Sequence, residues 1–539
     1  MDTSAEQVEA ARRRVAASPT DAEALFAFGN ALWWSGQPEA GIAAFTRAIE
    51  IRPDHAEARN NLGNAMLERG EPAAAVPHYR AALAIRPNHA PSLYNLGNAL
   101  LAAGQPTEAE QKFRAALAVL PTHAGALNNL GNVLRAQGRT AEAEDCYRQA
   151  VALRPEAAGS HNNLGSALLA LHRPADAAAC FMAALRLLPD YAEACNNLGG
   201  ALLALDRPEE AAQLFHRAAD LDPDLVQARF GESLALLSLG RFAEGWAAYE
   251  SRWRDPAFRE GVRTYDAPLW LGEPDVAGRT LLLHAEQGLG DTIQFVRYVP
   301  LLRARGARVV LEVQAPLLPL LRGLADDAVA EGADLPPHDL RCPLLSLPLA
   351  FGTELATIPA KVPYLAADRR LVAAWRKRLG PATRPRIGLA FSGSPEHPED
   401  ALRSIPAETL RPLLALAEVE WHVVQKDIRP ADAPVFAQVP AVRLHTERLE
   451  TFAETAALLT QMHLVVSVDT SVAHLAGALG LPVWLLLQAS ADFRWLRGRS
   501  DSPWYPTARL FRQAKALAWE REILAVAQAL RGFAAWWRG

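Results

Sequence analysis

A glycine recurs every 34 residues through the first half of the chain, and this period constrains the fold more than any other feature. Each glycine is followed at fixed distances by an aromatic residue, an alanine and a proline. The six glycines are Gly29, Gly63, Gly97, Gly131, Gly165 and Gly199. Six copies of one pattern predict six copies of one structural unit, and these units stack because one alone cannot bury its apolar face.

Each unit is predicted to be a pair of helices. In the second copy, Gly63 lets the first helix approach its partner, Tyr79 fills the space beside it, and Pro87 ends the second helix. The pattern resembles the tetratricopeptide repeat, a helix–turn–helix unit that stacks into a curved solenoid. We assign residues 1–255 to this α solenoid and interpret residues 226–255 as an atypical closing repeat.

Composition limits the class of protein further. A net charge of −5 gives no electrostatic reason to expect nucleic acid as a partner. No apolar run approaches the roughly 20 residues of a membrane span, and the polar start of the chain does not read as a signal peptide. The four cysteines show no metal-ligand spacing (Cys146, Cys180, Cys195 and Cys342). We therefore expect a cytoplasmic protein with reduced cysteines and no membrane span.

One asparagine column stands two residues before the repeat glycines, on the first helix of each pair. Its members are Asn61, Asn95, Asn129, Asn163 and Asn197. First helices line the concave face of a solenoid, where amides can donate and accept hydrogen bonds to an extended peptide backbone. The column resembles the asparagine ladder that holds the acceptor polypeptide in eukaryotic O-GlcNAc transferase. The alternative is that these amides only stabilise neighbouring helices.

The period stops near residue 256, and a linker rich in proline and glycine follows over 256–279. Beyond it, apolar strand patterns alternate with helical ones, which indicates a parallel α/β architecture. The clearest predicted strands are 280–284, 308–313, 386–391, 464–468 and 482–487. Two α/β lobes are expected, at 280–380 and 381–515, with a cleft between them and a C-terminal helix within 516–539.

Two segments carry a resemblance to a known family. Gly290-Asp291 follows the first strand, in a predicted tight turn before a helix from Thr292 to Arg305, and Val-Asp-Thr-Ser-Val-Ala-His-Leu-Ala-Gly-Ala-Leu-Gly spans 468–480. Both resemble signature regions of the lipopolysaccharide heptosyltransferases, glycosyltransferase family 9, over roughly residues 280–515. The combination with repeats is closer still to bacterial proteins of which some glycosylate flagellin.

The resemblance implies a GT-B fold of two Rossmann-like lobes, the first facing the acceptor and the second holding a nucleotide sugar. It also implies an inverting reaction that needs no metal and no cofactor, and a C-terminal helix that crosses back to the first lobe. The sequence shows no metal-binding triad and no Asp-x-Asp pair in the first lobe, in keeping with that expectation.

The loop before the helix that begins near Val472 is the first candidate for donor binding. A helix N-terminus favours anions, and Thr470 and Ser471 stand at this one. By resemblance, this loop binds the donor phosphates and Asp469 contacts the donor sugar, while His474 orients the loop or reaches a phosphate. The alternative is ordinary helix capping by Asp469 or Ser471.

A second candidate loop, Ser392, Gly393 and Ser394, follows the first strand of the second lobe, where small residues let the backbone approach phosphate. Arg403 stands near the place where heptosyltransferases carry a phosphate-binding lysine, and arginine offers a bidentate contact instead. Lys426 resembles the strand-end lysine that O-GlcNAc transferase uses for its diphosphate. For both cations the alternative is a solvated surface charge.

Asp291 is the candidate catalytic base. It aligns with the aspartate proposed for that role in heptosyltransferases, and a carboxylate facing the cleft could accept the acceptor's proton. The alternative is that Asp291 caps the helix predicted to start at Thr292. Its neighbours are expected on the acceptor side of the cleft (Glu286, Gln287, Gln294 and Arg297).

The sequence thus predicts an inverting glycosyltransferase that moves a sugar from a nucleotide-sugar donor to a hydroxyl of a protein held by the repeats, with flagellin as one candidate acceptor. One rival is transfer to lipopolysaccharide or another glycan. Another is a non-catalytic scaffold with a degenerate GT-B domain. No residue selects the donor nucleotide, and hexosyl, heptosyl and nonulosonyl transfer all stay open.

Overall fold

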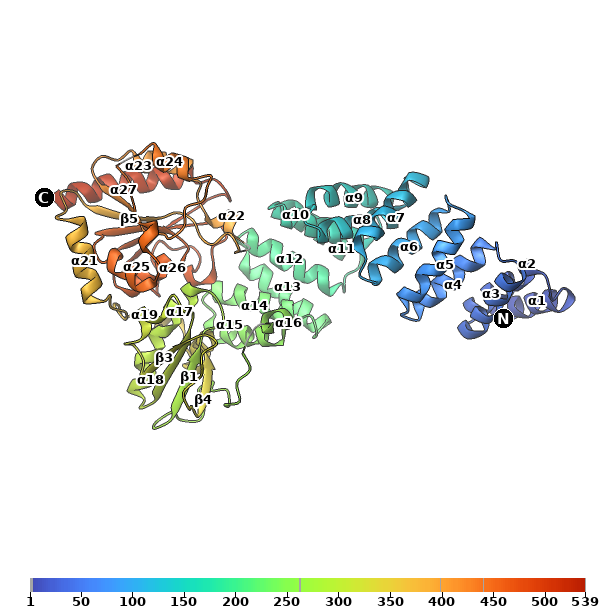
Figure 1. Ribbon diagram of the computed structural model, residues 1–539, viewed down its shortest axis with the longest axis horizontal. Helices are drawn as coiled ribbons and strands as arrows, with labels where there is room; N and C mark the ends of the chain where they lie inside the picture. The colour runs from blue at the N-terminus through green and yellow to red at the C-terminus, as the bar shows by residue number, and fades with distance from the viewer. Residues whose placement is uncertain (1–2, 261–262, 398, 440, 539) are drawn as a thin grey trace. The chain divides into compact units, whose positions relative to one another are not determined.

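The computed structural model describes residues 3–260, 263–397, 399–439 and 441–538 (Figure 1). They form two compact units, Met1–Ala201 and Leu202–Gly539. The first unit consists of helices, and the second adds two parallel sheets to further helix pairs. Among the described residues, no helix combines the length and the apolar character that a membrane crossing requires.

The helices of the repeats follow one another in pairs. They are α1 (Thr3–Ala17), α2 (Ala22–Trp34), α3 (Pro38–Ile51), α4 (Ala56–Glu68), α5 (Pro72–Ile85), α6 (Ala90–Ala102), α7 (Pro106–Val119), α8 (Ala124–Ala136), α9 (Thr140–Leu153), α10 (Ala158–Ala170), α11 (Pro174–Leu187) and α12 (Ala192–Ala204). A proline opens most second helices, where its missing N–H is no loss.

The repeat glycine is needed for the close pairing of two helices. A Cβ atom built on Gly63 would lie 2.7 Å from the ring of Tyr79, which is itself fully buried with Ala82. The same clash recurs between Gly97 and Phe113. The stacked helix pairs confirm the predicted solenoid.

The second unit opens with helices that continue the repeats. They are α13 (Pro208–Leu221), α14 (Val226–Ser238), α15 (Phe242–Tyr249), the 3₁₀ helix η1 (Glu250–Arg254) and α16 (Pro256–Arg259). Trp246 of α15 meets the rings of Phe295 and Phe493 edge-on, at 5.9 Å and 5.6 Å between centroids. These rings belong to one continuous core, so the closing helix pair α14–α15 is part of the unit that holds the sheets.

The first sheet has the parallel order β3-β2-β1-β4. Its strands are β1 (Thr280–His284), β2 (Arg308–Val313), β3 (Asp327–Ala330) and β4 (Leu340–Pro343). Its helices are α17 (Leu289–Phe295), η2 (Val296–Tyr298), α18 (Val299–Ala304), α19 (Leu318–Leu321), η3 (Leu344–Ser346), α20 (Leu347–Ala350) and η4 (Leu355–Thr357).

The prediction of one helix from Thr292 to Arg305 was wrong in two respects: the helix starts earlier, and it is interrupted. The structure begins α17 at Leu289, after Gly288, whose N–H donates a hydrogen bond to the side chain of Asp291. A 3₁₀ turn then separates α17 from α18, whose second residue is Pro300. The predicted tight turn at 288–291 is therefore mostly the first turn of a helix.

The second sheet has the parallel order β10-β9-β8-β5-β6-β7. Its strands are β5 (Arg386–Ala390), β6 (Glu420–Val423), β7 (Arg443–Leu444), β8 (Leu464–Val468), β9 (Val483–Leu487) and β10 (Ala508–Arg512). The five strands predicted from sequence all form, with ends within one residue of the prediction. Two parallel sheets with helices between their strands confirm the predicted two-lobed α/β fold.

Helices surround this sheet and connect its strands. They are α21 (Arg369–Leu379), α22 (Asp400–Arg403), η5 (Ala407–Leu410), α23 (Arg411–Leu414), α24 (Ala433–Ala437), η6 (Thr446–Arg448), α25 (Phe452–Leu459), α26 (Ser471–Ala478), η7 (Phe493–Trp495) and α27 (Glu520–Arg538). The strand order reverses between β5 and β8, which places the ends of these two strands side by side at the carboxyl edge. In open α/β sheets such a reversal is where ligands bind.

The C-terminal helix does not cross back to the first lobe, contrary to what the resemblance implied. Helix α27 packs on α23, η5 and β10. Its residues Ile523 and Val526 share a core with Ile387 and Leu389 of β5. The helix therefore completes the second sheet's own hydrophobic layer.

Candidate functional site

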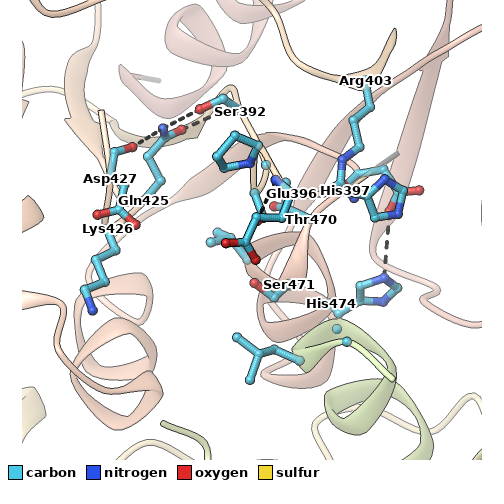
Figure 2. A pocket seen from close by; sticks show the side chains of 18 of the residues that line it. Ser392, Glu396, His397, Arg403, Gln425, Lys426, Asp427, Thr470, Ser471 and His474 are labelled. Atoms are coloured by element: carbon cyan, nitrogen blue, oxygen red, sulfur yellow. Dashed lines mark hydrogen bonds and ion pairs between the residues drawn. The ribbon is translucent and has the colours of Figure 1, made fainter. Parts of the chain in front are cut away.

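A cavity of about 970 Å³ lies over the carboxyl edge of the second sheet and is closed on one side by the first lobe. Its lining comes from the segments 287–291, 392–397, 424–430, 469–474 and 488–494. The ten residues that the sequence assigned to donor binding and catalysis all line it: Asp291, Ser392, Gly393, Ser394, Arg403, Lys426, Asp469, Thr470, Ser471 and His474. Figure 2 shows most of them around one space, contributed by separate segments.

Arg403 joins the two candidate phosphate loops. A Cβ atom on Gly393 would lie 2.5 Å from its guanidinium, so glycine at this position lets the side chain lie flat against the 392–394 loop. Its Nη1 donates to the carbonyl oxygen of Asp469 at 3.3 Å. The Nε is buried and has no hydrogen-bond partner among the described residues, and it lies 4.0 Å from Oδ1 of Asp400. A cation held between two loops, with an unused donor, is suited to bind an anion in the cavity.

The N-terminus of α26 faces the same cavity. Thr470 is the N-cap residue, its own side chain makes no capping hydrogen bond, and no other described side chain is seen to cap the helix. The alternative of capping by Asp469 or Ser471 is thus not what the structure contains. The first-turn N–H of Ser471 is available to an oxyanion, in a place where the helix dipole favours negative charge.

The loop at 392–394 is less available than its sequence suggested. The side-chain oxygen of Gln425 accepts hydrogen bonds from the Phe391 and Ser392 N–H groups, and its Nε2 donates to the Ser392 hydroxyl. The Gly393 N–H donates to the Ser404 hydroxyl at 3.1 Å. These groups shape the loop, and Ser394 with Arg403 is left as its ligand-facing part.

Asp469 and His474 form a buried pair on the α26 side of the cavity. Burial, reinforced by the nearby carboxylate of Asp492, raises the pKa of Asp469 to about 7. Burial also lowers the pKa of His474 well below its usual value, so its imidazole is neutral. The ring is fixed by a 2.9 Å hydrogen bond to the Tyr505 hydroxyl. A Cβ atom on Gly290 would lie 2.9 Å from this ring, so Gly290 allows α17 to reach α26.

Asp291 lines the cavity from the first turn of α17, which packs against the start of α26. Its side chain is 20% exposed, and its two carboxylate oxygens have different partners. Oδ2 accepts from the Gly288 N–H at 2.9 Å, and Oδ1 pairs with the guanidinium of Arg494. Burial raises the pKa of Asp291, against the opposing effect of Arg494. The structure thus contains both the cleft-facing carboxylate and the capping contact that the sequence offered as alternatives.

Several other sequence-based expectations meet a different outcome around α17. Gln287 lines the cavity and donates to the Tyr249 hydroxyl, whereas Gln294 and Arg297 are buried outside it. The side chain of Glu286 is completely buried against Arg252. The expectation that all four residues line the acceptor side was therefore wrong for three of them. Lys426, in contrast, is exposed at the rim of the cavity.

Sequence reasoning missed several polar residues of the lining, and four of them matter for the geometry of the site. They are His397, Gln425, Arg429 and Arg494. Gln425 and Arg429 lie in the loop after strand β6, and polar residues after a parallel strand are a usable signal for this edge of a sheet. Arg494 lies within Asp-Phe-Arg-Trp, which has no spacing that would point to a distant aspartate.

The asparagine column lies on the first helices, where its amide donors are used between repeats. Asn61 donates to Asn30 at 2.8 Å, and Asn95 donates to Asn64 at 2.9 Å. The same kind of contact recurs further along (Asn129 to Asn98, Asn163 to Asn128 and Asn197 to Asn162). The sequence analysis missed a second column of asparagines, which includes Asn64 and Asn98 and lies three residues after the first column. The Asn-x-x-Asn spacing that defines it is visible in the sequence. The helix-stabilising role that was weighed as an alternative is present in these contacts.

Comparison with known proteins adds a family to this geometry. Tetratricopeptide repeat families match residues 26–90, 88–156 and 162–226, and glycosyltransferase family 9 (heptosyltransferase) matches residues 449–514. The matched segment includes Asp469, Ser471 and Arg494, whereas Asp291 and Arg403 lie outside it.

Protein FlbA of Caulobacter vibrioides is 30% identical over 330 residues, which cover 55% of this chain and 53% of FlbA. The chain thus spans about half the length of this curated relative. Among solved structures, YrrB, a TPR protein with an unusual peptide-binding site, is 26% identical over 35% of this chain and 98% of YrrB, with a TM-score of 0.32. Pseudomonas aeruginosa pilF is 25% identical over 38% of this chain and 93% of pilF, with a TM-score of 0.34. The chain therefore carries tetratricopeptide repeats followed by a glycosyltransferase family 9 domain.

Proposed function

We propose that this protein is an inverting glycosyltransferase that works without a metal in the cytoplasm and transfers a sugar from a nucleotide-sugar donor to a hydroxyl of a protein acceptor. The observation that carries the proposal is the pairing of charges across one cavity. Arg403 and the uncapped start of α26 belong to the second lobe, and the carboxylate of Asp291 belongs to the first lobe and lines the same cavity.

The positive side of the cavity suits a departing nucleotide phosphate. When the bond between the sugar's anomeric carbon and the phosphate oxygen breaks, the negative charge that develops would be held by the Arg403 guanidinium and the Ser471 N–H. These donors are fixed by the fold before the donor binds, so little reorganisation is needed. They occupy the electrostatic role that a bound cation would otherwise take.

The negative side suits the acceptor. A hydroxyl that attacks the anomeric carbon must lose its proton as the new bond forms, and in this proposal Asp291, which lines the cavity, accepts that proton. Burial raises the pKa of Asp291, which makes its ionised form a stronger base than a solvated aspartate. Asp469 stands beside the phosphate-binding groups, where a contact with the donor sugar fits its position.

For the acceptor, we propose a protein held by the repeats. The amide donors of the asparagine column are used between repeats, which leaves its carbonyl oxygens at Asn95 and Asn163 without a protein partner among the described residues. Such oxygens can accept hydrogen bonds from the N–H groups of an extended peptide irrespective of its sequence. Flagellin is one candidate by the resemblance that the sequence carries.

Calorimetric titration with UDP, GDP, ADP, CDP and CMP tests the donor half. The variant Arg403→Ala/Ser471→Pro removes the fixed cation and one N–H, and proline is well tolerated at the first position of a helix. Arg411→Ala, an exposed arginine outside the cavity, is the matched control. One nucleotide should bind to the wild type and to the control with similar affinity and at least about tenfold more weakly to the double variant. Absence of binding for all five nucleotides would refute the transferase and favour a scaffold.

The acceptor half is tested by mass spectrometry of proteins that are purified together with the wild-type chain or with Asp291→Asn. A sugar mass on a protein that depends on Asp291 would support a protein acceptor. A sugar mass found only on glycans would refute this half and leave the donor half intact.

A further inference from the structure

Arg494 makes an ion pair that joins the two lobes at the cavity. It lies in η7, after strand β9 of the second sheet, and its Nη2 contacts Oδ1 of Asp291 in α17 of the first lobe. Its Nη1 donates to both carboxylate oxygens of Asp492, at 2.8 Å and 2.9 Å. One guanidinium thus connects a carboxylate of each lobe.

The surroundings hold this guanidinium rigidly. The side chain of Arg494 is only 8% exposed. Its guanidinium carbon lies 4.4 Å from the ring centre of Phe493 and 5.7 Å from that of Phe295. Phe493 in turn packs against Trp246 of the closing helix pair. Arginine between aromatic rings loses little further freedom when it binds a carboxylate, because its orientation is already set.

The consequence for Asp291 is a fixed direction and a defined charge. With Gly288 N–H on Oδ2 and Arg494 on Oδ1, the carboxylate cannot rotate freely about its side-chain bond. Burial disfavours the ionised form, whereas the positive charge of Arg494 favours it. A general base must be ionised before it can take a proton, so the partner that maintains the charge affects the reaction without touching the substrate.

We propose that Arg494 is a positioning residue that keeps Asp291 ionised and aimed at the acceptor hydroxyl, and that it does so only while the two lobes are joined. This inference rests on the proposed function, in which Asp291 is the base. Asp492 beside Arg494, His397 from the loop after β5 and Tyr249 from α15 also interact electrostatically with Asp291. Asp469 and His474, at the start of α26, line the same cavity.

The test compares three variants of the full chain. Arg494→Gln removes the charge, and Arg494→Lys keeps it. Arg497→Gln is the matched control, because Arg497 is a largely buried arginine in the same loop that pairs with Asp206 and does not contact Asp291. Folding is checked by circular dichroism melting. Nucleotide release is then measured from pH 5 to pH 9 with UDP-N-acetylglucosamine, GDP-mannose, ADP-glucose, CDP-glucose and CMP-N-acetylneuraminate.

In Arg494→Gln, the rate of nucleotide release at pH 6 divided by the rate at pH 9 should fall at least about tenfold. Loss of the positive charge beside Asp291 raises the pKa of its carboxyl group, so the rate begins to decline at a higher pH as the solution is acidified. Arg494→Lys and Arg497→Gln should keep the wild-type ratio. An unchanged ratio in Arg494→Gln would overturn the proposal, as would an equal change in Arg497→Gln, since a structural effect of losing any buried arginine would then explain it.

A second readout does not depend on turnover. Infrared spectroscopy follows the carboxyl band that titrates in the wild type and is absent in Asp291→Asn. This band should titrate at higher pH in Arg494→Gln than in the wild type, and near the wild-type pH in Arg494→Lys. If no donor is hydrolysed, the proposed function fails. The infrared titration then tests by itself whether Arg494 keeps Asp291 ionised, and a carboxyl band that titrates at the same pH in Arg494→Gln as in the wild type overturns that role.

Discussion

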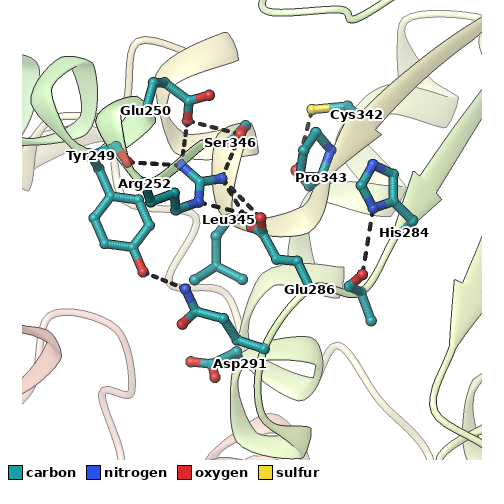
Figure 3. Close-up of polar contacts among 12 residues, drawn as sticks. Tyr249, Glu250, Arg252, His284, Glu286, Asp291, Cys342, Pro343, Leu345 and Ser346 are labelled. Atoms are coloured by element: carbon teal, nitrogen blue, oxygen red, sulfur yellow. Dashed lines mark hydrogen bonds and ion pairs between the residues drawn. The ribbon is translucent and has the colours of Figure 1, made fainter. Parts of the chain in front are cut away.

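Replacing Arg252 by methionine should destabilise the second unit strongly, and more at pH 8 than at pH 5. Arg252 follows the last helix pair, in η1, and pairs with Glu286 in the loop after β1 (Figure 3). The two side chains are 1% and 0% exposed. Nη2 of Arg252 lies 3.0 Å from each carboxylate oxygen of Glu286.

The expected size follows from the burial of this pair. Removing one partner of a buried ion pair costs about 3–5 kcal/mol, because the remaining charge is left without compensation. Methionine keeps much of the apolar length of arginine, so the loss reports mainly the charge. In Arg252→Met/Glu286→Gln the completely buried carboxylate is removed as well, and only the partly exposed Glu250 loses its partner, so most of the loss should be recovered. The matched control is Arg254→Met, two residues away and 55% exposed, which should cost no more than about 1 kcal/mol.

The pH dependence follows from Glu286. Burial raises its pKa from 4.5 to about 7, against the opposing effect of Arg252. A carboxyl group with a raised pKa in the folded state is protonated there at a pH where the unfolded chain is already ionised. Stability is therefore lost as the pH rises from 4.5 through 7. Without Arg252 the pKa of Glu286 rises further, so the cost of Arg252→Met grows over the same range and beyond it.

Equilibrium unfolding in urea, followed by tryptophan fluorescence at pH 5 and pH 8, measures these differences. All tryptophans except Trp33 and Trp34 lie in the second unit, so the signal reports its unfolding. The Arg252→Met loss should be larger at pH 8 by at least about 1 kcal/mol. An equal loss at both pH values would refute the charge argument, and a loss as large in Arg254→Met would refute the distinction between the buried and the exposed arginine.

Three further changes have defined outcomes. Asp291→Asn should lower turnover about 10²–10⁴-fold while the calorimetric affinity for the nucleotide stays unchanged, and retained turnover would exclude Asp291 as the base. Gly393→Ala should weaken nucleotide binding, because its Cβ atom meets the Arg403 guanidinium at 2.5 Å; Gly532→Ala in α27, which has nothing within 4 Å, should bind normally in the same titration. Asn95→Ala should cost the solenoid about 1 kcal/mol for each of its two inter-repeat hydrogen bonds, measured by thermal melting, and an unchanged melting temperature would show that these bonds add no net stability.

The parts of the fold that the sequence predicted well are those set by local patterns. The glycine and aromatic positions of the repeats fix the helix pairs because Gly63 and Tyr79 belong to adjacent helices of one unit. The buried strands are apolar throughout, so their ends could be assigned to within one residue. The start of α17 could not, because it depends on a single hydrogen bond from the Gly288 N–H to Asp291.

The candidate site could be predicted as far as its residues follow strands or open helices. The ten assigned residues gather in one cavity because parallel strands bring their carboxyl ends to the same edge. Arg494 and its partner Asp291 are 203 residues apart in the sequence, and Arg252 and Glu286 are joined in the same way across two elements. Pairs of this kind are set by tertiary packing, and no spacing in a single sequence reveals them.

The sequence period and the packing of the chain place the boundary between the repeats and the second unit at different residues, and this difference bears on how the cavity is supported. The period continues to about residue 255, whereas packing groups the chain from Leu202 with the sheets. A domain that began after residue 255 would lack Trp246, which packs on Phe493, and Arg252, which neutralises Glu286. Phe493 precedes Arg494, and Glu286 lies five residues before Asp291. Helix α15 and the 3₁₀ helix η1 therefore support both ends of the ion pair at the cavity, so the unit that holds the two sheets begins within the repeats.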